Sequence, residues 1–134
     1  MLHFHSVCEQ FAQILKGKST ITQDVCSVSL NRNFKVVVQG RMSRSVVPVD
    51  VLFESLDQSG HALCLAEIAL LEEEIPRFMH SIIQQGMIVS ALHNHWLYTR
   101  PTVMYIHIQS VEPPINFAKK IASSFSSLSS YPVA

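Results

Sequence analysis

Short runs in which apolar and polar residues alternate are the feature that most restricts how this chain can fold. One run covers residues 26–30 and another covers 34–38, and the residues between them, Asn31–Asn33, are typical of turns. Successive side chains of a strand point to opposite faces of a sheet, so alternation predicts strands with one buried face. The two runs therefore predict a β-hairpin. Their apolar members are Cys26, Val28, Leu30, Phe34, Val36 and Val38.

Two further pairs of strands follow from the same pattern. A strand at about 51–56 and an apolar run at 62–71 flank the turn sequence Asp57–Gly60, and strands at about 88–97 and 102–110 form the last pair. The segment 40–50 offers few packing cues and is interpreted as a connector. Short polar links between the runs favour antiparallel pairing.

Three other stretches carry apolar residues at helical spacing. The first covers about residues 4–16 and ends at Gly17. The second begins at the acidic run Glu72–Glu74, where negative charge stabilises a helix N-terminus, and ends at Gly86. The third begins at Pro113, and proline is well tolerated in a first helical turn.

The predicted order is α-ββ-ββα-ββα, which is an α+β fold. Helices gathered on one face of an antiparallel sheet give such a domain a single core. We expect one globular domain over residues 1–125 and a Ser-rich tail over 126–134 that frays.

Composition excludes several classes of partner. The formal net charge is zero and charged residues make up 15% of the chain, so there is no basic stripe for nucleic acid. The sequence contains no run of eighteen apolar residues that would predict a membrane span. It also contains no Lys/Arg cluster that would predict binding to a membrane surface. Low charge repels copies of the chain weakly, so a homo-oligomer is one expectation.

The cysteines and the N-terminus favour a cytoplasmic protein. Cys8, Cys26 and Cys64 are odd in number and widely spaced, without a CxxC motif, so we expect reduced, buried, slowly reacting thiols. The first sixteen residues lack the basic region and the apolar core of a secretory signal.

Two motifs look like chemistry without its structural context. The sequence GKST at 17–20 lacks the earlier glycine of a phosphate-binding loop, and a helix rather than a strand precedes it. The letters HNH at 93–95 name a nuclease class, but those nucleases distribute the three residues along a longer unit. A neutral chain also lacks the charge for DNA binding.

Three histidines in the last predicted hairpin are the candidate site. His93, His95 and His107 carry odd numbers, so all three should share one face. The apolar residues that should point to the other face carry even numbers: Leu92, Trp96, Met104, Ile106 and Ile108. A five-residue loop, 98–102, would place His93 opposite His107, whereas a four-residue loop would separate them. Three imidazoles on one patch suit zinc or another divalent transition metal. The alternative is histidines that decorate a sheet and form local hydrogen bonds.

These residues also carry a family resemblance. Segments along about residues 45–125 resemble the LppY/LpqO-type bacterial domain of unknown function, whose namesakes look like exported lipoproteins. The resemblance implies a fold and a cluster of polar positions, and it carries no assigned activity. Ala66 departs from the glycine of the family pattern. The matching residues are Glu67, Glu74-Ile75-Pro76, Ala91-Leu92-His93-Asn94-His95, Pro101 and His107.

Two classes of function follow from this reading. The first is a divalent-metal-dependent hydrolase in which His93, His95 and His107 bind the metal. Glu67 or Glu74 would then act as the fourth ligand or as the general base. The second is a non-catalytic module that binds or senses a metal or a small ligand, or a structural homo-oligomeric domain. Glu67 is the better placed carboxylate because its strand neighbours the hairpin, whereas Glu74 has the alternative role of capping its helix.

Overall fold

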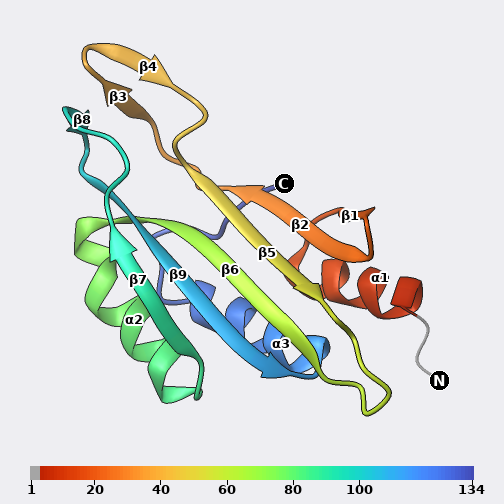
Figure 1. Ribbon diagram of the computed structural model, residues 1–134. Helices are drawn as coiled ribbons and strands as arrows, with labels where there is room; N and C mark the ends of the chain where they lie inside the picture. Colours follow the sequence, from red (N-terminus) through yellow and green to blue (C-terminus); the bar gives the residue numbers. More distant parts are fainter. Residues whose placement is uncertain (1–3) are drawn as a thin grey trace.

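The computed structural model describes residues 4–134, in which six strands form one antiparallel sheet and three helices cover one of its faces (Figure 1). The strand order is β1-β2-β5-β6-β9-β7, and every pair in this sheet is antiparallel. The predicted α+β class is confirmed. The strands of this sheet are β1 (Ser19–Thr22), β2 (Val25–Asn31), β5 (Pro48–Glu54), β6 (Ala62–Leu71), β7 (Ile88–His93) and β9 (Val103–Glu112). The helices are α1 (Phe4–Leu15), α2 (Ile75–Gln84), which follows the 3-10 turn η1 (Glu72–Glu74), and α3 (Pro114–Phe125).

A second sheet replaces the first predicted hairpin. Its strands are β3 (Val36–Val38), β4 (Arg41–Ser43) and β8 (Thr99–Arg100), in the order β4-β3-β8. The prediction that 26–30 pairs with 34–38 is therefore wrong, because β2 pairs with β1 and β5 instead. Two-residue turns at Gln23–Asp24 and Gln39–Gly40, all with positive φ, close the β1–β2 and β3–β4 hairpins.

The main core lies between the six-stranded sheet and the helices. Alternation works as predicted here: Val49, Val51 and Phe53 of β5 are fully buried on the helix side. The helices contribute Phe11, Phe78, Ile82, Phe117 and Ile121 to this core, all of them fully buried. Burying side chains of this size contributes about 1.5–3 kcal/mol each, so the helix face supplies most of the apolar stabilisation.

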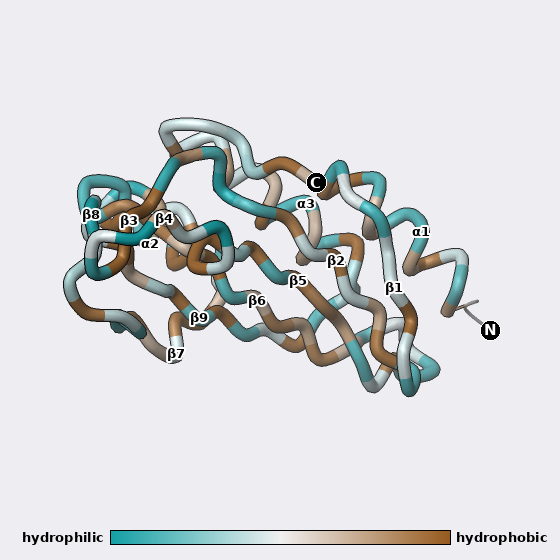
Figure 2. The backbone as a smooth tube through the Cα atoms, turned by 90° about the horizontal axis from the view of Figure 1, so that it is seen from above, coloured by the Kyte–Doolittle hydropathy of each residue, from teal (hydrophilic) through white to brown (hydrophobic). Residues whose placement is uncertain are grey.

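The opposite face of the sheet is covered only at one end. A small second core forms where the three-stranded sheet and its connections fold over β6 and β9. Figure 2 shows β3, β4 and β8 together at the end of the molecule away from α1. The rest of this face remains half-exposed, and we call it the open face. The buried members of the second core are Val36, Val46, Val47, Ala69, Val103 and Tyr105.

The cysteines correct one prediction. Cys8 of α1 and Cys26 of β2 form a disulfide, with Cα atoms 5.7 Å apart, whereas reduced thiols were expected. The physical reason is tertiary: α1 packs on β2, and both sulfurs lie on the buried sides that face each other. Cys64 is free and buried, and this burial raises the pKa of its thiol to about 12.

The C-terminal tail contacts the rest of the domain. The backbone N–H of Ser129 donates a hydrogen bond to Glu74, and Val133 pairs with Asn31 at the end of β2. Leu128 is only 9% exposed. The tail therefore supplies hydrogen-bond partners to the buried Glu74 and covers part of the core.

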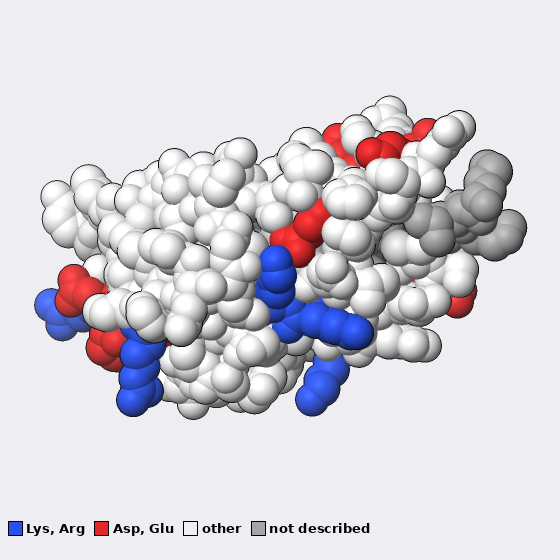
Figure 3. Space-filling view, turned by 90° about the horizontal axis from the view of Figure 1, so that it is seen from below, with Lys and Arg blue, Asp and Glu red and all other residues white. Residues whose placement is uncertain are grey.

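Charge is sparse on the surface. The face seen in Figure 3 is mostly uncharged, and its Lys and Arg side chains lie near Asp and Glu side chains at two places. This mixed distribution agrees with the formal net charge of zero.

Candidate metal centre

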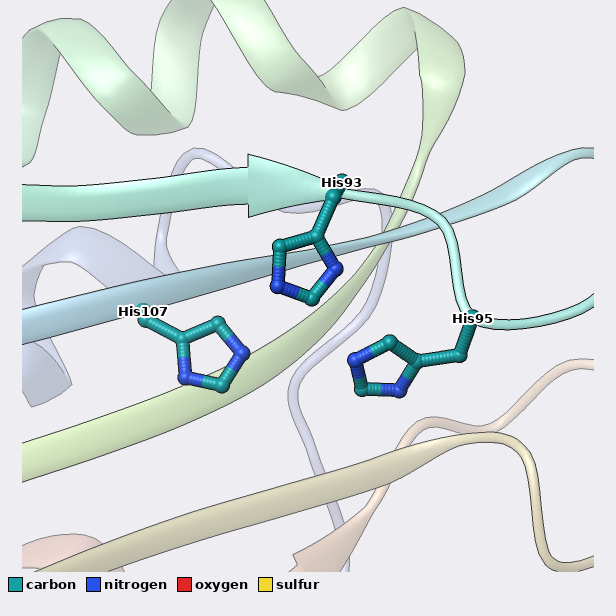
Figure 4. A group of neighbouring side chains, drawn as sticks. All are labelled: His93, His95 and His107. Carbon is teal, nitrogen blue, oxygen red and sulfur yellow. The ribbon is translucent and has the colours of Figure 1, made fainter.

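His93, His95 and His107 converge on the open face, as predicted from their parity. The ring centroids of His93 lie 4.7 Å from His95 and 5.1 Å from His107, and those of His95 and His107 are 6.2 Å apart. One ligand nitrogen from each ring lies within 4.8 Å of the other two. Figure 4 shows a nitrogen of each ring directed into the space between them.

The strand register differs from the prediction. His93 pairs with Tyr105, and His107 pairs with Ala91, so the two histidines are diagonal rather than directly opposite. A bulge between Val89 and Ala91 causes a second difference. The extra residue moves Ile88 to the open face, where it is 56% exposed, although its parity predicted a core position.

Diagonal placement still brings the rings together. Diagonal neighbours on one sheet face are about 7–8 Å apart at Cα, which long or aromatic side chains can span. His93 ends β7, and His107 lies in the middle of β9, so the rigid sheet fixes both of these rings.

Tyr105 holds the third histidine in place. His95 lies in the connection after β7, and its ring stacks on the ring of Tyr105 at 4.4 Å between centroids and 13° between planes. The buried Tyr105 hydroxyl donates a hydrogen bond of 2.6 Å to the Val46 carbonyl, and burial raises the pKa of this phenol. Sequence reasoning missed this role, although Tyr105 shares the odd parity of His107.

Glu67 is the carboxylate that lies beside the cluster. It is the direct cross-strand partner of His107, and its Oε1 lies 4.0 Å from His107 Nε2. That distance is too long for a hydrogen bond. His107 Nε2 is buried and has no hydrogen-bond partner among residues 4–134. Buried polar atoms usually have a hydrogen-bond partner, and a water molecule or a bound ion would supply one to this nitrogen.

Glu74 lies elsewhere, although sequence reasoning paired it with the histidines as a candidate. Its two oxygens accept hydrogen bonds of 2.8 and 2.7 Å from the guanidinium of the buried Arg32, and further bonds from Leu71 and Ser129. Burial alone would raise the pKa of Glu74, but these hydrogen bonds outweigh it and lower the pKa to about 2. The structure makes Glu74 a buried structural anion.

The donor set of the cluster fits a divalent transition metal. Imidazole nitrogens bind zinc, copper, iron and nickel well, and a carboxylate next to them is a common further ligand or base. The ligand nitrogens lie within 4.8 Å of one another, close enough for one ion to be shared among them. His95 is exposed, so the cluster opens to solvent.

Comparison with known proteins gives a family without an activity. Residues 9–127 match a family profile described as Domain of Unknown Function (DUF1259). No curated protein and no solved structure was found to match. Within residues 4–134, no helix combines the length and the apolar character that crossing a membrane requires.

Proposed function

The chain belongs to the DUF1259 family of domains of unknown function, and we propose that it binds a divalent transition-metal ion through His93, His95 and His107 and uses it in hydrolysis. The profile covers most of the chain, so the histidine cluster lies inside the family domain. The ALHNH segment supports the narrower assignment to LppY/LpqO-type domains.

One observation carries the proposal. Three imidazoles, two from the sheet and one from a loop, bring ligand nitrogens within 4.8 Å of one another, and one of these rings has a buried nitrogen without a partner. A bound cation would satisfy that nitrogen. Histidines that merely decorate a sheet have no need to converge.

The surroundings of the cluster support catalysis at an accessible site. A bound divalent ion with an open coordination position would activate a water molecule or polarise a carbonyl. Stacking on Tyr105 orients His95, and Glu67 lies where it can accept a proton or act as a further ligand. The exposed side of His95 leaves room for a small-molecule substrate.

The disulfide bears on where the protein works. Disulfides persist in oxidising compartments and are rare in a reducing cytoplasm. The Cys8–Cys26 bond therefore favours an oxidising compartment over the cytoplasmic location that reduced thiols would have indicated.

Metal binding is tested with protein that carries no polyhistidine tag. Elemental analysis of the purified protein and calorimetric titration with Zn²⁺, Mn²⁺ and Ni²⁺ should give about one ion per chain. The His93→Ala, His95→Ala double variant should lose this binding. His61→Ala and His80→Ala are the controls, because both residues lie outside the cluster. His3→Ala should also leave metal binding unchanged, although His3 lies outside the described residues.

Two results would separate the alternatives. A wild-type protein that binds none of the three metals would refute the proposal. A protein that binds metal but hydrolyses no member of a panel of activated esters, phosphoesters and amides would favour the non-catalytic module.

A further inference from the structure

Asp50 extends the histidine and carboxylate constellation to a third strand of the sheet. Asp50 on β5 is the direct partner of Glu67 on β6, and Glu67 is the direct partner of His107 on β9. The neighbours of Asp50 on β5, Val49 and Val51, are fully buried on the helix side, so Asp50 projects from the open face. A row of carboxylate, carboxylate and imidazole therefore crosses the middle of this face.

The two carboxylates oppose each other in an unusual way. Directly opposite side chains on one face have Cβ atoms about 4.5–5.5 Å apart, and like charges placed there repel each other. Asp50–Glu67 is the only cross-strand pair of the described six-stranded sheet in which both residues are charged. Both residues are half-buried, so water screens this repulsion incompletely.

The described residues around this pair supply no compensating Lys or Arg. The row continues with Ser29 on one side, and beyond His107 it ends with Ala91. Within residues 4–134, no Lys or Arg forms an ion pair with either carboxylate, and the nearest basic nitrogen is Nε2 of His107, 4.0 Å from Glu67. The neighbouring positions on the same face are uncharged: Pro48, Leu52, Leu65, Ala69, Tyr105 and Gln109.

We propose that Asp50 is part of the metal centre and that Asp50 and Glu67 together balance the charge of a divalent cation. This inference rests on the proposed function. Glu67 supplies the carboxylate nearest the ion, and Asp50, one strand further away, is a positioning residue that acts through Glu67. Neutral imidazoles contribute no charge, so two carboxylates match the double charge of the cation.

A charge-neutral variant of Asp50 tests this role with an internal control. Glu54 lies on the same strand and the same face, but its partner is Leu63, so Glu54→Gln removes one charge without relieving a pair. Asp50→Asn should raise the melting temperature of the metal-free protein, because it removes the repulsion. The same variant should bind Zn²⁺ about five- to tenfold more weakly, the size expected for the loss of one negative charge two strands away from His107. Asp50→Glu should restore the affinity, and Glu54→Gln should change neither quantity.

The opposite signs make the test specific. A structural role for Asp50 would lower the melting temperature with and without Zn²⁺, and that result would overturn the inference. If the wild type binds Zn²⁺ and Asp50→Asn binds it with the same affinity, the inference is overturned and the proposed function stands. Failure of the wild type to bind Zn²⁺ would refute the proposed function and this inference together. Asp50→Ser provides the same comparison if Asp50→Asn does not fold.

Discussion

Acid should destabilise this protein through Glu74. The pKa of this carboxyl is lowered from 4.5 to about 2 in the folded state, against the opposing effect of burial. The folded state therefore favours the carboxylate more strongly than the unfolded chain does. By linkage, the resulting stabilisation is complete above a pH of about 4.5 and is lost as the pH falls toward 2. At about 1.4 kcal/mol for each tenfold change in proton affinity, the effect amounts to about 3 kcal/mol.

Removing the negative charge of Glu74 by mutation at neutral pH should lower the free energy of unfolding by at least as much. Glu74→Gln leaves the fully buried guanidinium of Arg32 without its anion, and breaking one partner of such a pair typically costs about 3–5 kcal/mol. The Arg32→Met, Glu74→Leu double variant should recover much of this loss, because it leaves no unpaired buried charge. Metal affinity should stay unchanged in every folded variant, because Glu74 does not belong to the histidine cluster.

Urea unfolding between pH 7 and pH 2.5 measures both effects. By pH 2.5, the free energy of unfolding of the wild type should have fallen by about 2.5 kcal/mol more than that of Glu74→Gln. Glu73→Gln is the control, because Glu73 lies in the same turn but is exposed. Parallel pH profiles for the wild type and Glu74→Gln would refute this reasoning.

Three further predictions concern the thiols, Tyr105 and the metal. Alkylation of the denatured, unreduced protein should modify Cys64 alone, and reduction should add two sites and cost about 2–4 kcal/mol of stability; three modified thiols without reductant would contradict the disulfide. In the native protein, Cys64 should react slowly at neutral pH, because its pKa is raised to about 12. Tyr105→Phe should cost about 1 kcal/mol through the lost hydrogen bond to Val46, with little change in metal affinity, whereas Tyr105→Ala should weaken metal binding by releasing His95; equal affinities in titration would disprove the positioning role. Metal affinity should fall on acidification because protons compete for the imidazoles, and a pH-independent affinity would point to other ligands.

Parity along the strands was enough to predict that His93 and His107 share a face, whereas His95 lies beyond the end of β7, where strand alternation does not determine its position. His93, His95 and His107 all occupy odd positions, and this alternation holds on both strands from Ala91 onward. It could not predict the bulge near Ser90, because an extra residue changes the face of Ile88 without leaving a clear mark in the residue types. The register of the two strands depended on the length of the loop that joins them, which the sequence does not reveal. The diagonal relation of His93 and His107 therefore also escaped prediction.

Features that depend on packing between distant segments were out of reach. The pairing of Cys8 with Cys26 follows from the way α1 lies on β2, which residue spacing does not reveal. The two-residue turn Gln23–Asp24 has positive φ without a glycine, so the hairpin that contains β1 gave little signal. The anchoring of the tail by Glu74 required knowing that this acid is buried.

The location of His95 has a consequence for what metal removal would do to the molecule. His93 and His107 belong to the sheet, whereas His95 lies in the connection between β7 and β8. An ion held by all three would act as a reversible cross-link between a rigid strand pair and a surface loop. Its loss would leave the main core folded and would release only that loop. Amide hydrogen exchange in residues 94–98 should therefore respond most strongly to the presence of the ion.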